Sequence, residues 1–231
     1  MSTKVKFCGI TTLTDAERAV GEGAWAIGLI FWPASPRRCE PAAAAEIAAA
    51  VRRRVEVAGV FVNPTLDELA QTADAVELTM LQLHGDEGPA FCAEAARRTG
   101  CKVIKAARVR SGADIQALTP FHTDYHLLDS HVPGQPGGTG ETFAWELARA
   151  HRGTVPMILS GGLNPGNVAE AIATVGPFAV DVASGVERSP GHKDPDQLKA
   201  FAAAVAAAHA PRPAGPHAAR RRPAHARAGR S

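Results

Sequence analysis

The chain has 231 residues, 45% of them hydrophobic, so it can bury one sizeable core and lies in the size range of a single barrel domain. Its formal net charge is only +2. No run approaches the roughly 18 consecutive apolar residues of a transmembrane helix, and no secretory segment is recognisable. The four cysteines form no C-x-x-C pair; they are Cys8, Cys39, Cys92 and Cys101. These features argue against a membrane protein and a disulfide scaffold, and they predict a cytoplasmic protein with reduced thiols.

The charge is unevenly distributed along the chain. Six of the 25 basic residues, all arginines, lie from Ala210 onward, where there is no acidic residue. The other 19 basic residues are outnumbered by 23 acidic residues, so the body is mildly acidic. The end of the chain is rich in Pro, Ala and Arg and has no aromatic residue for base stacking. We therefore expect a folded domain over residues 1–208 and a disordered basic tail over 209–231, with neither nucleic acid nor membrane as a partner.

Short apolar runs recur at intervals of 22 to 31 residues, which is the span of one strand, one helix and two loops. The runs are nearly continuously apolar, as expected for strands of a parallel sheet covered on both faces. There are eight of them: KVKFC from Lys4, AIGLIF from Ala26, VAGVFV from Val57, TMLQL from Thr79, KVIKA from Lys102, YHLLD from Tyr125, PMILS from Pro156 and AVDVA from Ala179. The pattern predicts an α/β fold closed into a single (β/α)8 barrel, with an open doubly wound sheet as the alternative.

Helix-start signals lie between these runs. Thr14 with Glu17 three residues later forms a capping-box pattern, which predicts a helix that begins at Thr14. Asn63 and Pro64 precede the helical stretch TLDELAQTA. Asn164 and Pro165 are typical of an N-cap and a first-turn residue, so a further helix is predicted to begin there.

Two reactive side chains end predicted strands. Cys8 ends the first run, on the same strand face as Lys6, and Asp129 ends the sixth. Chemistry in such barrels occurs where strands end, so the two side chains can face each other across the barrel mouth. A thiolate would serve as a base if a nearby cation lowered its pKa, and a carboxyl group in semi-apolar surroundings can hold a proton for delivery. Taken alone, Cys8 would be a small buried hydrophobe and Asp129 an N-cap or an ion-pair partner.

Glycine-rich turns follow the seventh and eighth runs, where barrels usually bind phosphate. Gly161 and Gly162 lie in SGGLNPGNV, and Ser184 and Gly185 lie in ASGVE. Their backbone amides predict a site for a small phosphate ester. Arg37, after the second run, can hold a carboxylate, although an isolated loop arginine is more often only solvated. The glycine-rich loop HVPGQPGGTGE after Asp129 is interpreted as a lid or as a disordered segment. No set of metal ligands is recognisable, so neither a metal nor another cofactor is expected.

Several of these segments together resemble the phosphoribosylanthranilate isomerase family of tryptophan biosynthesis, over about residues 4 to 201. They are KFCGIT, GLIFWPASPR, GVFVN, LQLHGDE, LLDS followed by GGTGETFAW, LSGGLNPGNV and DVASGVERSPGHKD. The resemblance implies a cofactor-free TIM barrel that performs an Amadori rearrangement, with Asp129 as general acid and Cys8 as general base. It also implies that Arg37 binds the anthranilate carboxylate, that Gly161, Gly162, Ser184 and Gly185 bind phosphate, and that Asp181 orients the substrate. His84 receives no role.

Three rival interpretations stay open at this point. A barrel of the indole-glycerol-phosphate synthase or ribulose-phosphate epimerase kind would share the phosphate site, but the first should show a catalytic lysine and glutamate and the second a metal set. A non-catalytic sugar-phosphate-binding barrel would have lost Cys8 or Asp129. A nucleic-acid-binding role would depend on the arginine tail alone. We expect a monomer that acts on a small-molecule substrate.

Overall fold

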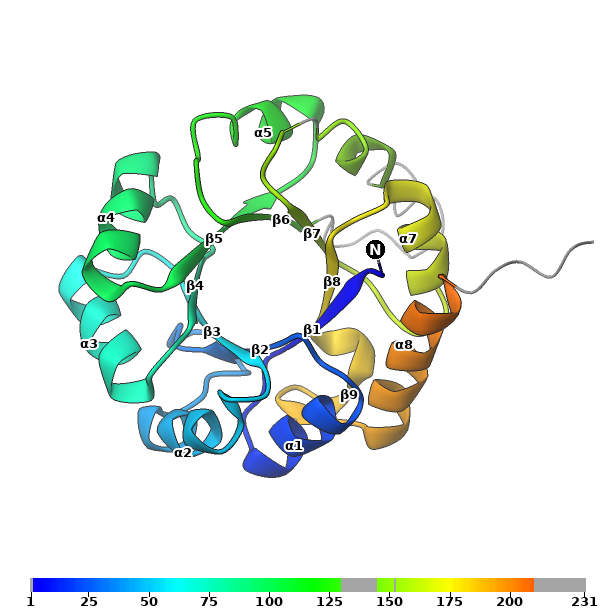
Figure 1. The fold of residues 1–231 in the computed structure, drawn as a ribbon, viewed down its shortest axis with the longest axis horizontal. Coiled ribbons are helices and arrows are strands. Elements are labelled where there is room, and N and C mark those ends of the chain that lie inside the picture. Colours follow the sequence, from blue (N-terminus) through cyan, green and yellow to red (C-terminus); the bar gives the residue numbers. More distant parts are fainter. Residues whose placement is uncertain (1, 130–144, 152, 210–231) are drawn as a thin grey trace, which may run out of the picture.

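A closed barrel of eight parallel strands forms the centre of the computed structural model, which describes residues 2–129, 145–151 and 153–209 (Figure 1). Each strand pairs with the next along the chain, and β8 pairs with β1. The strands are β1 (Lys4–Cys8), β2 (Ala26–Ile30), β3 (Glu56–Phe61), β4 (Met80–Leu83), β5 (Lys102–Arg108), β6 (Tyr125–Asp129), β7 (Met157–Ser160) and β8 (Ala179–Val182). The predicted barrel is thus confirmed, and the open sheet is excluded.

Helices surround the barrel on its outside (Figure 1). They are α1 (Leu13–Gly21), α2 (Pro41–Val51), α3 (Leu66–Val76), α4 (Pro89–Thr99), α5 (Gly112–Gln116), α7 (Val168–Val175) and α8 (Pro195–Ala207), with a 3-10 turn η1 (Ser184–Val186) after β8. The segment 130–144, which contains the loop interpreted as a lid, lies outside the described residues. So do residues 210–231 of the expected tail, whereas His209 is described and accepts a hydrogen bond from the backbone N–H of Thr3.

Two predicted helix starts are wrong. The first helix is capped by Thr12, whose side chain accepts a hydrogen bond from the backbone N–H of Asp15, so Thr14 lies inside the helix. The helix after β7 begins at Val168, with Asn167 as its N-cap residue. Asn164 instead forms a turn, because its side-chain oxygen accepts from the backbone N–H of Gly166 two residues on. In both places, polar residues with similar capping ability compete within a few positions.

The core has two layers, which follow from the two-residue period of a strand. Outward-facing residues pack against the helices; Phe7, for example, meets Phe201 of α8 edge to face, with ring centroids 6.0 Å apart. Phe7 thus faces away from Cys8, as the alternation of side chains along a strand requires. Inward-facing residues fill the barrel with a small apolar cluster: Ala58, Met80, Ile104, Ala106, Leu127, Ile158 and Ala179. The interior is therefore a packed core that supports the side chains at the mouth.

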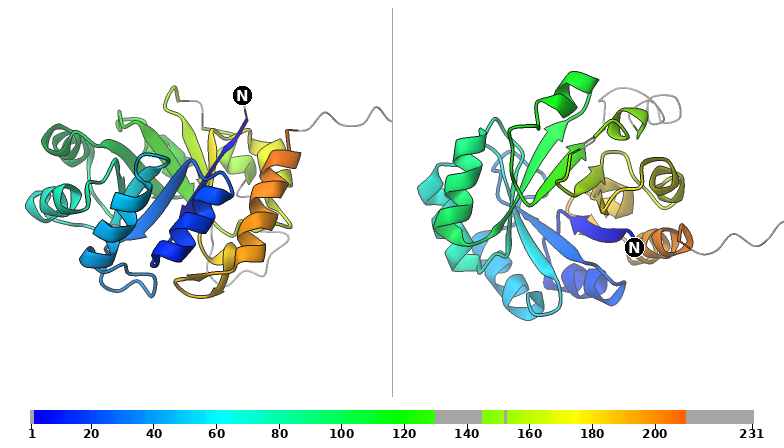
Figure 2. Two further views of the ribbon diagram at one scale, coloured as in Figure 1. Left: turned by 60° about the horizontal axis from the view of Figure 1, so that its bottom comes forward. Right: turned by 45° about the horizontal axis from the view of Figure 1, so that its top comes forward.

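The carboxyl ends of the strands and the N-terminus lie at opposite ends of the barrel. In the left-hand view of Figure 2, the N-terminus is at the top and the gold segment that follows β8 is at the bottom. That segment includes a hairpin of β9 (Glu187–Ser189) and β10 (His192–Lys193), which the sequence did not predict. The hairpin adds a polar wall to the mouth end of the barrel.

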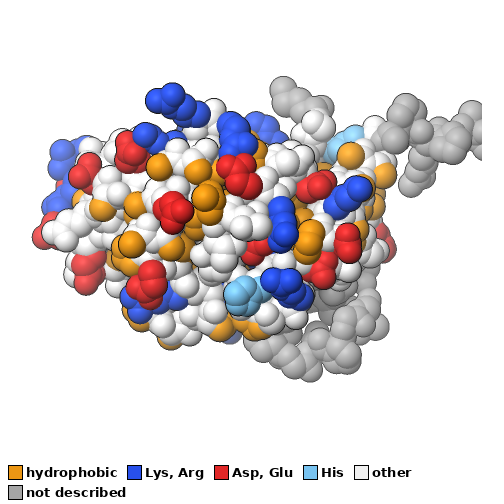
Figure 3. Space-filling model, turned by 90° about the horizontal axis from the view of Figure 1, so that it is seen from below, with side chains coloured by type: hydrophobic (Ala, Val, Ile, Leu, Met, Phe, Trp, Pro, Cys, Tyr) orange, Lys and Arg blue, Asp and Glu red, His pale blue; other side chains and the backbone are white. Residues whose placement is uncertain are grey.

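The outer surface carries charges of both signs. On the face drawn in Figure 3, lysine and arginine side chains are interspersed with aspartate and glutamate side chains. The ion pairs on this surface include Arg54–Glu17 at 2.6 Å, between the turn after α2 and α1, and Arg98–Asp67 at 2.7 Å, between α4 and α3. In the part of the chain that the structure describes, no helix has the length and apolarity needed to cross a membrane.

Candidate active site

Cys8 is the last residue of β1 and lies on the inner side of the barrel, directly above Lys6. Both side chains are buried, and the Lys6 ammonium is close enough to the thiol to act on its pKa. Burial raises the pKa of the Cys8 thiol above its ordinary value, and the positive charge of Lys6 opposes that shift. A cation adjacent to the thiol, which Cys8 needs to act as a base, is therefore present, but burial outweighs it.

Lys6 is held by Asp181 on the neighbouring strand β8. Its ammonium lies 2.8 Å from Asp181 Oδ1, and the other carboxylate oxygen accepts from the Ser160 hydroxyl at 3.2 Å. Burial acts to lower the pKa of Lys6, but the charges of Asp181 and Cys8 outweigh burial and raise it. Lys6 is therefore kept as an ammonium beneath the thiol. Asp181 faces Lys6 inside the barrel, in a position to fix this cation.

Gly28 leaves the space that the Cys8 thiol and the Lys6 ammonium occupy. It lies opposite Cys8 in the β1–β2 register. A Cβ at this position would lie 2.7 Å from Cys8 Sγ and 3.1 Å from Lys6 Nζ, so any side chain there would displace the thiol. The absence of a side chain at Gly28 therefore determines where the sulfur can lie.

Asp129 ends β6, three strands from β1 around the barrel. Its side chain is 23% exposed, so it reaches the mouth and is not sealed in the core. His84, directly after β4, is exposed to a similar extent, and its Nε2 lies 3.6 Å from Asp129 Oδ2. The two predicted acid–base residues are thus both at the mouth end of the barrel, and Asp129 has an imidazole beside it.

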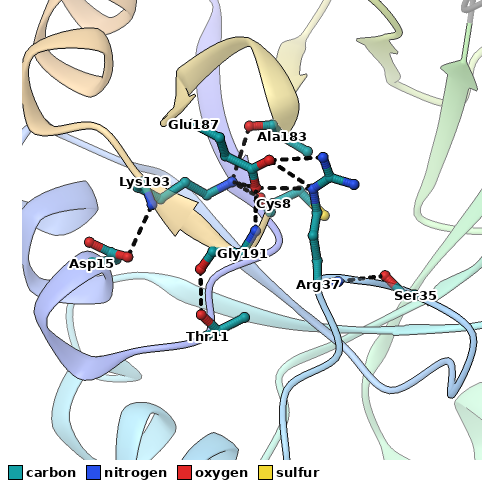
Figure 4. Close-up of polar contacts among 9 residues, drawn as sticks. All are labelled: Cys8, Thr11, Asp15, Ser35, Arg37, Ala183, Glu187, Gly191 and Lys193. Atoms are coloured by element: carbon teal, nitrogen blue, oxygen red, sulfur yellow. Dashed lines mark hydrogen bonds and ion pairs between the residues drawn. The ribbon is translucent and has the colours of Figure 1, made fainter. Parts of the chain in front are cut away.

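Arg37, in the loop between β2 and α2, is gripped by Glu187 (Figure 4). Its Nε lies 3.0 and 2.9 Å from the two Glu187 oxygens, and Nη2 lies 2.8 Å from Oε2. Glu187 is almost fully buried; burial acts to raise its pKa, but hydrogen bonds from Arg37 and Lys193 outweigh burial and lower it. The clamp predicted for a substrate carboxylate therefore has a fixed orientation.

Lys193 joins this clamp to the strand that carries the thiol. Its buried ammonium donates to the carbonyl oxygens of Cys8 at 2.6 Å and Ala183 at 3.1 Å, and to Glu187 at 2.9 Å (Figure 4). Burial lowers the pKa of Lys193, and Glu187 opposes that shift. One lysine on the β9–β10 hairpin thus ties together the end of β1, the loop after β8 and the Arg37 clamp.

The two glycine-rich loops meet at the mouth. Gly161 and Gly162 have φ angles of 95° and 65°, which favour glycine, and they turn the chain directly after β7. A Cβ on Gly185 would overlap the carbonyl oxygen of Leu163, so the loops after β7 and β8 are in direct contact. Ser184 begins the 3-10 turn of the second loop. The four predicted phosphate-site residues therefore come together on one side of the mouth.

Comparison with known proteins identifies the family. The sequence model of one family, described as N-(5'-phosphoribosyl)anthranilate (PRA) isomerase, matches residues 5–204, which is most of the chain. The chain belongs to this PRA isomerase family. A PRA isomerase of Citrifermentans bemidjiense is 49% identical over 197 residues, covering 85% of this chain and 94% of the relative.

Solved structures of PRA isomerases have the same fold. The crystal structure of the enzyme from Thermotoga maritima is 41% identical, has a TM-score of 0.82 and covers 89% of this chain and 99% of that chain. Another PRA isomerase structure, in complex with reduced 1-(o-carboxyphenylamino)-1-deoxyribulose 5-phosphate, is 38% identical with a TM-score of 0.77, and the two shares are again 89% and 99%. That ligand carries both a phosphate and a carboxylate.

Three side chains of this site were not predicted from the sequence. His84, Glu187 and Lys193 all lie in segments that carried the resemblance, but no role was derived for them. Glu187 and Lys193 each contact partners more than 100 positions away in the sequence. Among the described residues, no group of three or more His, Cys, Asp or Glu side chains is arranged to hold a metal ion.

Proposed function

We propose that the protein converts N-(5'-phosphoribosyl)anthranilate to 1-(2-carboxyphenylamino)-1-deoxyribulose 5-phosphate, an aldose–ketose isomerisation of tryptophan biosynthesis (EC 5.3.1.24). The observation that carries the proposal is the pairing of a thiol beside a buried ammonium with a carboxyl group at one barrel mouth, in a chain of the PRA isomerase family. The reaction needs one proton donor and one proton acceptor, and Asp129 and Cys8 fit these needs.

Asp129 is the proposed general acid. Its carboxyl proton passes to the ring oxygen of the ribose as the C1–O bond breaks, and the anthranilate nitrogen supplies the electron pair for a C1=N bond. The sugar is then open and carries a Schiff base, while Asp129 is a carboxylate. The partial exposure of Asp129 at the mouth suits a group that must reach a bound substrate.

Cys8 is the proposed general base. Its thiolate removes the proton from C2, and the electrons of the C–H bond move to neutralise the iminium nitrogen, which gives an enolamine. That enolamine tautomerises to the ketone when C1 gains a proton and the C2 hydroxyl loses its proton. The Lys6 ammonium beside the thiol favours the thiolate, and Asp181 holds that ammonium in place. We propose that Asp181 orients the substrate indirectly, by holding Lys6 in place.

The two ends of the substrate match the two sides of the mouth. Backbone amides around Gly161, Gly162, Ser184 and Gly185 suit the phosphate, because paired glycines let main-chain N–H groups approach an anion. Arg37, oriented by Glu187, suits the anthranilate carboxylate. The chemistry needs no cofactor, since the substrate supplies all the electrons that move.

The test is turnover of freshly generated phosphoribosylanthranilate, followed as loss of anthranilate fluorescence without added metal. We expect activity in the wild type and losses of at least about 100-fold in Cys8→Ala and in Asp129→Ala, the scale of general acid–base groups. Cys101→Ala is the matched control, since Cys101 directly precedes β5, at the end of the barrel opposite the mouth. A folded wild type that binds a phosphate-bearing substrate analogue without turnover would support the alternative, a non-catalytic or differently specific sugar-phosphate-binding barrel.

We further propose a cytoplasmic monomer without nucleic-acid or membrane partners. The interspersed surface charges support this, and all the proposed site residues belong to one chain. Truncation after His209 keeps the hydrogen bond between Thr3 and His209 and removes the six arginines of the tail. Turnover should be unchanged by the truncation, and sedimentation of the full chain should give one protomer mass. Salt-sensitive DNA binding that the truncation abolishes would contradict the proposal.

A further inference from the structure

The imidazole of His84 lies between the proposed general acid and a buried amide inside the barrel. Its Nε2 faces Asp129 at 3.6 Å, and its Nδ1 lies 3.3 Å from Nε2 of Gln82. We propose that Gln82 and His84 are positioning residues that present an N–H to Asp129 and so set its orientation and its acidity. This inference rests on the proposed function, in which Asp129 is the acid.

Gln82 and the Asp129 carboxylate together favour one position for the proton of the neutral His84 ring. It lies on β4, and only 1% of it is exposed, so water cannot replace its contacts. An amide nitrogen only donates, so His84 Nδ1 must accept, and the single proton of the neutral ring is then on Nε2, facing the carboxylate. The reversed amide would make Nδ1 the donor and leave a lone pair of Nε2 opposite the Asp129 oxygen. The carboxylate therefore favours the first arrangement.

The backbone after His84 is fixed by hydrogen bonds to the buried carboxylate of Glu87. The Glu87 carboxylate accepts from the backbone N–H groups of Asn63 at 2.8 Å and Gly85 at 2.9 Å, and from Lys105 Nζ at 2.8 Å. Lys105 also donates to the Gly85 carbonyl at 2.7 Å. A Cβ on Gly85 would overlap the Asn63 side chain, so the two loops are in contact. His84 is thus held from its backbone as well as from its ring.

An N–H beside a carboxylate favours the charged form, so His84 makes Asp129 a stronger acid and stabilises the anion left after proton transfer. The separation of 3.6 Å is longer than a hydrogen bond, and catalytic contacts of this kind commonly shorten when substrate binds. The effect should therefore appear mainly in kcat, because it is strongest as charge develops on Asp129.

The experiment compares steady-state kinetics and pH profiles of His84→Phe, His84→Gln and Gln82→Met in the full chain. His84→Phe should lower kcat about 10- to 100-fold with little change in KM, and the limb of the profile that Asp129 sets should move to higher pH. Gln places an N–H near the position of Nε2, so His84→Gln should recover most of the rate. Gln82→Met should shift the same limb in the same direction by a smaller amount. His122→Gln, at an exposed histidine before β6, is the control.

A second readout does not depend on turnover. Nitrogen-15 NMR of labelled histidine should show His84 as the Nε2–H tautomer in the wild type and a mixture of tautomers in Gln82→Met. A His84→Phe rate within twofold of wild type, or a loss of rate with an unmoved limb and no recovery in His84→Gln, would overturn the inference. An inactive wild type would overturn the proposed function instead, and the tautomer measurement would then decide whether Gln82 sets the proton of His84.

Discussion

The Cys8 thiol and the Lys6 ammonium act on each other's pKa. Burial raises the pKa of the thiol, while Lys6 and, more weakly, Lys193 lower it, so the supply of thiolate depends mainly on the Lys6 charge. Asp181 keeps Lys6 charged. Burying three ionisable side chains in one layer of the barrel lowers the stability of the fold. This arrangement suits a base that should ionise only with Lys6 in place.

Replacing Lys6 with Met should raise the Cys8 pKa further and shift the thiol-dependent limb of the rate profile to higher pH. We expect kcat/KM at neutral pH to fall at least about 100-fold, as for loss of the base itself. Ultraviolet absorbance of the thiolate against pH, with Cys8→Ser as the blank, measures the pKa directly.

The same substitution leaves the Asp181 carboxylate buried without its ion pair, which costs about 3 to 5 kcal/mol of stability. The double variant Lys6→Met/Asp181→Leu removes that charge and serves as the control for folding. The Asp181 charge itself raises the pKa of Cys8, so the double variant is compared with Asp181→Leu alone. If the thiolate absorbance titrates at the same pH in both, Lys6 does not tune Cys8.

Glu187 orients Arg37 through both of its carboxylate oxygens. In Glu187→Gln the bidentate, charged contact is lost, and the misoriented clamp should raise KM for phosphoribosylanthranilate about tenfold, the scale of one charge-assisted hydrogen bond. An aniline analogue that lacks the carboxylate should show no such rise. Glu40→Gln, in the exposed pair with Arg38, is the matched control. Equal losses for both substrates would mean that Glu187 supports the loop and not the recognition of the carboxylate.

At the scale of elements, the close approach of β1 and β2 matters as much as any single side chain. Gly28→Ala would push a methyl group against the thiol and Lys6. We expect a loss of at least tenfold in kcat/KM, together with a loss of about 1 to 3 kcal/mol in the free energy of unfolding from overpacking. Turnover and urea unfolding measure the two effects separately.

Gly21→Ala provides the comparison, because a Cβ at Gly21 of α1 would meet nothing within 4 Å. That variant should keep its activity, and its stability should be equal or slightly higher, since alanine favours helix. Full activity in Gly28→Ala would show that the barrel relaxes without moving the thiol, contrary to the tight fit described above.

The sequence predicted the alternation of side chains along the strands correctly, but it misplaced the starts of two helices. The strand period placed Lys6 beneath Cys8 and Phe7 on the outer face, because alternation is a property of the backbone and needs no tertiary information. The starts of α1 and α7 were misplaced, since Thr12 competes with Thr14 and Asn167 with Asn164. For α1, a distant contact accompanies the observed start: the Asp15 carboxylate accepts from the backbone N–H of Lys193.

The same limit applies to the site. The thiol, the carboxyl group and the glycine-rich loops each end a strand, so the general rule for barrels predicted where to look. Glu187 and His84 act on other side chains, and their importance emerges only when Arg37 and Asp129 are seen beside them. No local pattern distinguishes such a residue from an ordinary loop glutamate or histidine.

At the scale of the whole molecule, the two ends of the barrel differ in character. The mouth holds the proposed reactive groups, whereas the opposite end is closed by aromatic rings. Trp25, Tyr125 and Phe178 pack with centroids 5.3 Å apart, and the Lys4 ammonium lies over two of these rings. This end contributes packing, so variants there should alter stability before they alter turnover.

Two histidines, His126 on β6 and His151, should make the free energy of unfolding depend on pH, independently of the reactive groups at the barrel mouth. His126 Nδ1 lies 3.0 Å from His151 Nε2, and His126 Nε2 faces the Phe121 carbonyl at 2.9 Å. Burial lowers the pKa of both rings below the ordinary value of 6.5. The unfolded chain therefore binds protons first as the pH falls, and the folded state should lose stability below pH 6.5 until the folded-state pKa values are passed.

The loss should not exceed about 1.4 kcal/mol per pH unit for each histidine. Carboxylates whose pKa is lowered in the fold, such as Glu94 at about 2 and Glu187, contribute in the same direction only at lower pH, near their unfolded values. Urea unfolding between pH 8 and 5 measures the slope. His151→Gln should make it shallower, whereas His192→Gln, at an exposed position on β10, should leave it nearly unchanged. Equal slopes in wild type and His151→Gln would mean that this histidine does not carry the pH dependence.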